Sequence, residues 1–306
     1  MARPAPAADG APPARRVDQG RAYALALAAV FLWSTVASAF KLSLRAVSPV
    51  TLLLGASLVS ALAVCLILAA QGRHRLLTGD GWRGLGRSAL LGFLNPFLYY
   101  VILFEAYQRL PGQEAQPLNF TWAITLTVLS VPLLGQRIRP AGFAAILVSF
   151  IGVYVISTRG DLTGFRFTDP VGVACALGSS VLWALFWILS TRDRRDAVAK
   201  LGLSFAWGTV YTVILAAVLG ELSMPPRAGL VGAVYVGLFE MGVTFVLWQK
   251  ALELSRTTAQ ISNLIFLAPF VSLVLLHLVA GESIYPSSVV GLVFIVAGIL
   301  MQRRWG

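Results

Sequence analysis

Two carboxylates of this chain lie inside apolar segments. Glu240 stands in the run "VGLFEMGVTF", near the middle of its segment, and Glu105 lies near one end of another. A charged side chain at the centre of a bilayer costs at least ~2.5–3.5 kcal/mol, so such residues are usually functional. Both are candidates for proton coupling, and Glu240 also for binding a substrate amine. The alternative for each is a structural acid paired to a neighbouring helix.

Aromatic side chains stand at mid-depth in two further apolar segments. Trp33 and Trp183 each lie far from the ends of their segments. Tryptophan in membrane proteins usually gathers at the two membrane–water interfaces. We therefore predict that both line a cavity and stack on an apolar or aromatic substrate, with packing between helices as the alternative. We place the two tryptophans on opposite walls of this cavity. The aromatic residues Tyr99, Tyr100, Trp122 and Trp248 add to the same predicted site.

A glutamine and an asparagine recur at the same spacing in two apolar segments. The stretches "AQPLN" and "AQISN", 144 residues apart, contribute Gln116, Asn119, Gln260 and Asn263. An amide inside the membrane either bonds a neighbouring helix, for under ~2 kcal/mol, or faces a cavity. We interpret all four as gate or helix-joint residues, and the two asparagines also as cavity residues.

The composition indicates whether these residues lie in a membrane or in water. Of the 306 residues, 58% are hydrophobic and only 12% are charged, whereas soluble domains carry about 25% charged residues. The chain is therefore predicted to be an all-α polytopic membrane protein. The net charge of +11 does not indicate nucleic-acid binding, because the basic residues lie between apolar segments and form no continuous face.

The sequence gives no reason to expect a cofactor. Its two cysteines and two histidines (Cys65, Cys175, His74 and His277) have neither metal-ligand nor disulfide spacing. No glycine-rich phosphate loop and no catalytic cluster is visible, so we expect no enzyme activity. A polytopic enzyme acting on lipid precursors is a remote alternative, which would require polar clusters at one membrane face.

Ten apolar segments are long enough to cross a bilayer, which takes about 20 residues. Charged, proline-rich or glycine-rich stretches separate them. The least marked break is "QRLPGQ", where Pro111 and Gly112 interrupt a run too long for one span. The predicted spans are 22–42, 50–70, 87–108, 112–134, 140–158, 170–191, 202–221, 229–249, 257–280 and 285–302.

The basic residues predict the orientation. With ten spans, eighteen of the 24 lysines and arginines fall on the side of the termini and six on the other. Cytoplasmic loops carry the excess of basic residues. Both termini are therefore predicted to be cytoplasmic in a bacterial-type inner membrane. Residues 1–20, rich in alanine and proline, should form a disordered cytoplasmic tail.

The chain contains an internal repeat. Three blocks of matched residues recur in the same order, at offsets of 150, 144 and 146. They predict two five-helix repeats, 21–158 and 170–302, joined by an extracytoplasmic loop at 159–169 and followed by a cytoplasmic end at 303–306. Because five is odd, the second repeat enters the membrane from the opposite side. Such inverted repeats are typical of secondary transporters with a site near the midplane.

The stretches "FLWSTVASAFKLSLRAVSP", "GQRIRPAGFAAILVSFIGVYVIS" and "GESIYPSSVVGLVFIVAGILM" resemble the EamA-type branch of the drug/metabolite transporter superfamily. The resemblance covers about residues 22–302. It implies that the first four helices of each half surround a central cavity, while the fifth and tenth pack outside. The run Asn119, Phe120, Thr121, Trp122 is also similar to the fourth span of bacterial aromatic amino acid exporters in this superfamily.

These observations predict a secondary active or facilitative transporter of a small organic metabolite. An amino acid, hydrophobic or aromatic, is the first substrate class, and the resemblance favours export by alternating access. Efflux of lipophilic cations is the alternative, and it requires Glu240 to line the cavity. The expected partners are the substrate and the lipid bilayer, with the chain as a monomer or homodimer.

The inverted repeat makes a prediction about the two asparagines. Their spans start on opposite sides, so Asn119 and Asn263 should lie at opposite mouths of the pathway. We expect Asn119→Ala and Asn263→Ala to bias opposite conformations, measured as the thiol accessibility of cysteines placed at each mouth. A shift in the same direction in both variants would contradict this prediction.

Overall fold

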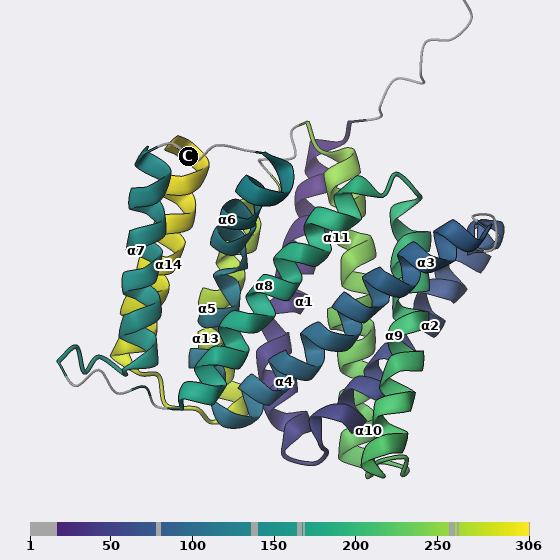
Figure 1. The fold of residues 1–306 in the computed structure, drawn as a ribbon, viewed down its shortest axis with the longest axis horizontal. Helices are drawn as coiled ribbons and strands as arrows, with labels where there is room; N and C mark the ends of the chain where they lie inside the picture. Colours follow the sequence, from purple (N-terminus) through teal and green to yellow (C-terminus); the bar gives the residue numbers. More distant parts are fainter. Residues whose placement is uncertain are drawn as a thin grey trace, which may run out of the picture.

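The computed structural model describes residues 17–77, 81–135, 140–163, 167, 169–256, 261 and 263–305. These residues form helices joined by short turns, without a strand among them (Figure 1). The helices that cross the molecule in the first half are α1 Gln19–Leu44, α2 Pro49–Ala70, α3 Gly81–Gly92 with α4 Tyr99–Arg109, α5 Gly112–Phe120 with α6 Trp122–Leu134, and α7 Pro140–Ser157. Those of the second half are α8 Pro170–Arg192, α9 Ala197–Leu219, α10 Arg227–Val236 with α11 Val243–Leu254, α13 Ala268–Ala280 and α14 Pro286–Trp305.

The described helices confirm the predicted fold class. Eight of them are long and apolar enough to cross a membrane, counting α3–α4, α5–α6 and α10–α11 as one helix each. Two shorter apolar helices complete a set of ten in the described ranges: Gly142–Ser157 within α7, and Leu264–Ala280 across η4 (Asn263–Leu267) and α13. The predicted spans agree with these helices to within a few residues, apart from the third and seventh, which start earlier, the eighth, which ends later, and the ninth, which includes residues outside the described ranges.

Local chemistry explains where the helices begin and end. Asp18 caps the first turn of α1 and Asp169 that of α8, each accepting a backbone N–H three residues later. Glycine at the ends of α6 and α13 adopts the left-handed conformation that commonly terminates helices, with φ of 68° at Gly135 and 72° at Gly281. These two glycines are a matched pair of the internal repeat, so both halves use the same stop signal.

Two membrane-crossing helices contain a feature that the sequence did not lead us to predict. The third is interrupted by a π-helical segment, η2 (Phe93–Leu98), and the eighth by another, η3 (Gly237–Gly242). The two segments are 144 residues apart, the offset of the fourth and ninth spans. Paired breaks in symmetry-related helices are a common mark of transporter binding sites, and π-turns often lie at functional sites.

The helix contacts follow a pseudo-two-fold pattern. Helix α1 packs on α11 and α13, and its counterpart α8 packs on α4 and on α5–α6. The pairs α2–α9 and α7–α14 each join equivalent helices of the two halves. Figure 1 shows that α1 begins at the end of the molecule where the C-terminus lies, whereas α8 begins at the opposite end. The two five-helix halves are therefore inverted.

Helices α7 and α14 form an antiparallel pair at one side of the molecule (Figure 1). Small residues bring their backbones together. A Cβ built on Gly152 would lie 2.4 Å from the carbonyl oxygen of Gly291, and one on Gly298 would meet the side chain of Ser149. Ser149 also donates a hydrogen bond to the Ile295 carbonyl at 3.2 Å. Small residues at helix interfaces are the usual basis of close packing in membranes.

The packing of this pair predicts the effect of a single methyl group. Gly152→Ala should push α7 from α14, and overpacking of this kind costs ~1–3 kcal/mol. We expect the thermal unfolding temperature of the purified protein to fall by roughly 2–10 °C. Gly178→Ala in α8 is the matched control, because among the described residues no neighbouring helix comes within 4 Å of its Cβ position. Equal stability of the two variants would show that this contact is unimportant.

Candidate functional site

A cavity of about 710 Å³ lies between the two halves. Its wall comes from α1, α4, α5 and α6 of the first half and from α8, η3, α11, η4, α13 and α14 of the second half. It extends to Leu134, Gln302 and Arg303, which lie at the helix ends nearest the C-terminus. The described cavity therefore reaches the end of the molecule where α1 begins and α14 finishes.

Glu240 lines the cavity and lies inside the η3 break. One carboxylate oxygen accepts a hydrogen bond from the Tyr100 hydroxyl at 2.9 Å. The backbone carbonyl of Glu240 accepts a hydrogen bond from Trp33 Nε1 at 3.4 Å. No lysine, arginine or histidine of the described chain forms an ion pair with this carboxylate. The cavity thus holds an acidic group without a protein cation beside it.

Aromatic rings surround this carboxylate. Trp33 and Trp183 both line the cavity, and both contact Phe245, at ring-centroid distances of 5.4 and 6.0 Å. Trp33 also packs against Trp248 at 5.3 Å, and Trp183 against Tyr99 at 4.7 Å. The two tryptophans predicted on opposite walls are thus linked through one intervening ring. Such a lining suits a flat apolar or aromatic ligand.

Asn119 connects three helices at the cavity wall. Its amide nitrogen donates to Ser179 Oγ of α8 at 2.8 Å, and its amide oxygen accepts a hydrogen bond from the Tyr99 hydroxyl of α4 at 3.3 Å. Gln116 and Trp122 also line the cavity. Asn119 therefore joins neighbouring helices and also lines the cavity.

The remaining predicted site residues lie elsewhere. Glu105 is outside the cavity wall and forms an ion pair with Arg109, one turn later on α4, at 2.6 Å. Their side chains are 35% and 41% exposed, and a helical i,i+4 pair of this kind explains Glu105 without proton coupling. Tyr100 lies behind the wall, 1% exposed, and reaches the cavity only through Glu240. Gln260 and the side chain of Asn263 lie outside the described residues.

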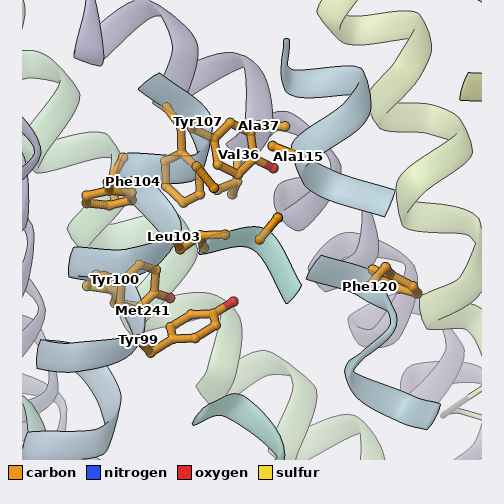
Figure 2. Packing of buried hydrophobic residues seen from close by; sticks show 14 of the residues in the cluster. Val36, Ala37, Tyr99, Tyr100, Leu103, Phe104, Tyr107, Ala115, Phe120 and Met241 are labelled. Atoms are coloured by element: carbon orange, nitrogen blue, oxygen red, sulfur yellow. The ribbon is translucent and has the colours of Figure 1, made fainter. Parts of the chain in front are cut away.

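The opposite end of the cavity is closed by aromatic packing. Phe40 of α1 contacts Phe104 and Tyr107 of α4, at ring-centroid distances of 4.8 and 5.1 Å. Figure 2 shows the aromatic residues of α4 stacked along one helix, beside Val36 and Ala37 of α1. Lys41 adds to this closure by donating hydrogen bonds to two backbone carbonyls at the end of α4, at 2.8 and 3.0 Å.

Sequence reasoning missed several aromatic members of the site, among them Phe245 and Trp187. In an apolar span an aromatic residue is usually lipid-facing or packed, so composition gives no sign of a cavity. A usable signal was the helix break. Asn95–Pro96 in one half and the pair Gly237 and Gly242 in the other mark corresponding interruptions.

Within the described ranges, no group of three or more histidine, cysteine, aspartate or glutamate side chains is arranged to hold a metal ion. A helical membrane protein with two inverted halves and a cavity between them has the architecture of secondary transporters. A family model described as the EamA-like transporter family matches residues 20–158 and 170–303. The chain belongs to this family, and thereby to the drug/metabolite transporter superfamily.

Relatives of this chain are distant in sequence but match most of its length. An aromatic amino acid exporter, YddG, of Ancylobacter novellus is 26% identical, covering 87% of this chain and 90% of its own. A probable terminal-alkyne amino-acid exporter of Streptantibioticus cattleyicolor is also 26% identical, covering 90% and 91%. An uncharacterized transporter of Clostridium kluyveri is 28% identical, covering 74% and 73%.

A solved crystal structure shares the fold. It superposes with a TM-score of 0.63, covering 93% of this chain and 96% of that one, at 22% sequence identity. The likeness supports the arrangement of helices alone.

The cavity makes a prediction about solvent access. We expect Thr127→Cys and Thr191→Cys, both on the cavity wall, to react with a membrane-impermeant thiol reagent added on the side of the termini. The background replaces the two native cysteines with serine, and Ser43→Cys, buried near the opposite end, serves as the unreactive control. Labelling of the cavity cysteines only from the other side would contradict the described geometry.

Proposed function

We propose that this transporter exports a small amine-bearing metabolite, an amino acid with an aromatic or hydrophobic side chain being the first class. The observation that carries the proposal is the cavity-facing carboxylate of Glu240, ringed by aromatic side chains and without an ion-pair partner among the described residues. An amine or a proton would supply the missing positive charge. The names of two relatives, both amino acid exporters, support the substrate class and the direction.

The roles of the site residues follow from their positions. Glu240 would bind the substrate amine or, in its absence, a proton, so that the two ligands compete for one carboxylate. Trp33, Trp183 and Trp122 would stack on the side chain of the substrate. Tyr100 would position the Glu240 carboxylate by its hydrogen bond. Exclusion of water by the surrounding rings would strengthen each polar contact.

Alternating access would come from the two inverted halves. We propose that the units 21–158 and 170–302 rock about their pseudo-two-fold axis, as in other inverted-repeat transporters. Gln116, Asn119, Gln260 and Asn263 would act at the mouths and helix joints.

The excess of basic residues on the side of the termini favours a bacterial-type inner membrane with both termini in the cytoplasm. The open end of the described cavity would then face the cytoplasm, from which an exporter loads. Helix α14 contributes to the cavity wall near its mouth, and we propose that the transporter works as a monomer or a homodimer.

Efflux of lipophilic cations is a second candidate, favoured by one observation. An amino acid carries a carboxylate as well as an amine. Among the described residues, no lysine, arginine or histidine on the cavity wall near Glu240 is placed to bind that carboxylate. Arg303 lies on the cavity wall only at its mouth, above the Phe266 ring at 5.1 Å. A cation without an acidic group would need no such partner.

Transport by the reconstituted full-length chain tests the proposal. We expect proteoliposomes to move labelled tryptophan or phenylalanine, and a pH gradient to change the rate. Glu240→Gln should lower that rate by about 10- to 100-fold, because a hydrogen bond to a charged group is worth ~1.5–3 kcal/mol.

Glu253→Gln is the matched control, since Glu253 pairs with Lys250 at the protein surface and should keep full activity. Transport of tetraphenylphosphonium instead of any amino acid would favour the second candidate. Failure of all these substrates, or an undiminished rate in Glu240→Gln, would overturn the proposed site.

A further inference from the structure

A second acidic residue, far from the cavity opening, is only half compensated. Glu114 lies in the first turn of α5 and has no exposed surface. One of its oxygens accepts a hydrogen bond from Arg159 Nε at 2.6 Å. The other, Oε2, is buried and accepts no hydrogen bond from the described part of the chain. A buried charge with an unpaired oxygen is costly, and binding a proton removes that cost.

The other charged groups near Glu114 are better compensated. Glu282, in the turn after α13, accepts backbone hydrogen bonds with both oxygens, from Gly112 at 2.8 Å and Gln113 at 3.2 Å. It therefore caps the positive end of α5, which stabilises its ionised form. Lys41 of α1 also acts on Glu114 electrostatically. Its ammonium group, however, donates its hydrogen bonds to backbone carbonyls at the end of α4. A proton on Glu114 would therefore disturb fewer hydrogen bonds than a proton on Glu282.

The same residues hold this end of the pathway closed. The side chain of Gln113 bridges α5 to the α13–α14 turn, donating to the Ser283 carbonyl and accepting from the Tyr285 N–H. Arg159, at the end of α7, stacks over the Tyr285 ring at 5.0 Å while it holds Glu114. Arg159 thus links α5 to the α13–α14 turn, and these two segments must separate when this end opens.

We propose that Glu114 is a second proton-binding group of the transporter and that its protonation keeps this end closed, while its ionisation favours opening. In the closed end the ionised carboxylate is buried with one oxygen unpaired, and Arg159 offsets only part of that cost. The neutral acid carries no such cost, and opening lets water solvate the ionised form, so acid on this side favours the closed state. This inference concerns a gate and is independent of the substrate proposed above.

The sequence restricts this device to one end of the protein. At the offsets of the repeat, Lys41, Glu114 and Glu282 correspond in sequence to Thr191, Thr258 and Gln136. Each of these three ionisable residues thus has an uncharged counterpart. A proton-sensitive gate at one end of an otherwise symmetric pathway gives the two sides different responses to pH.

A distance measurement across the closed end tests the proposal. Nitroxide labels at Gln108→Cys on α4 and Leu278→Cys on α13 occupy exposed positions outside the gate residues. Pulsed electron resonance of the full chain in lipid nanodiscs, with both native cysteines replaced, gives the label distance. We expect the longer distance to give way to the short one as the pH is lowered, because the buried carboxyl of the closed end gains more from a proton than the solvated carboxyl of the open end.

Variants assign the response to one carboxyl group. Glu114→Gln, which mimics the neutral acid, should show the short distance at every pH. Glu221→Gln is the matched control at the same end, because Glu221 bonds Ser48 at the start of α2 and lies outside the gate; it should keep the parental response. Arg159→Met should move the midpoint upward by about one to two pH units, because the carboxylate loses its only described donor.

Three results would overturn the proposal. They are a parental protein whose distance ignores pH, a Glu114→Gln variant that keeps the parental response, and a response abolished by Glu282→Gln but not by Glu114→Gln. If Glu114→Gln does not fold, the midpoint of Arg159→Met decides, and an unchanged midpoint counts against the gate.

Discussion

The hydrogen bond between Tyr100 and Glu240 joins the two halves of the protein where a helix of each half is interrupted. Glu240 lies inside the break of one helix, and Tyr100 follows directly after the corresponding break of its counterpart. A carboxylate at this depth would be too costly in a regular lipid-facing helix. The break turns it toward the cavity, and the rings around it keep out lipid. The position of the acid thus constrains the bends of both helices and the lining of the cavity between them.

The inverted repeat supplies similar walls from both halves, and the charged residues make the two ends differ. At one end, aromatic packing around Phe40 and the contacts of Lys41 and Glu114 close the pathway. At the other, the cavity extends past Leu134 to Arg303. The described state is therefore open at the end of the termini. A symmetric scaffold with unequal closures can rest in one conformation and change to the other when a ligand binds the second state better.

The sequence predicted the architecture well because membrane helices obey simple constraints. Apolar length, the Pro111–Gly112 break and stop signals such as Gly135 gave the ten spans, and the spacing of matched residues gave the repeat. The site was predicted in part. Glu240, Trp33, Trp183 and Asn119 do meet at the cavity, because mid-span polar and aromatic residues are rare enough to be informative.

What the sequence concealed depends on contacts between distant helices. A π-turn leaves the apolar pattern unchanged, so the breaks in the third and eighth helices were not foreseen. Phe245 becomes a cavity residue only because α11 packs against α1. Glu105 was a weaker candidate than it seemed, since Arg109 one turn later offers a local partner that the spacing alone reveals. The partner of Glu114, 45 residues away at Arg159, could not be read from the sequence.

The central claim is that a substrate amine and a proton share the carboxylate of Glu240. The most direct measurement is the proton release that accompanies ligand binding to the purified protein in weak buffer, followed with a pH-indicator dye. At a pH where the empty site is protonated, the account predicts about one proton released for each amine-bearing ligand bound, and none in Glu240→Gln. Tight binding of the same ligand without proton release at any pH, or equal release by the variant, would contradict it.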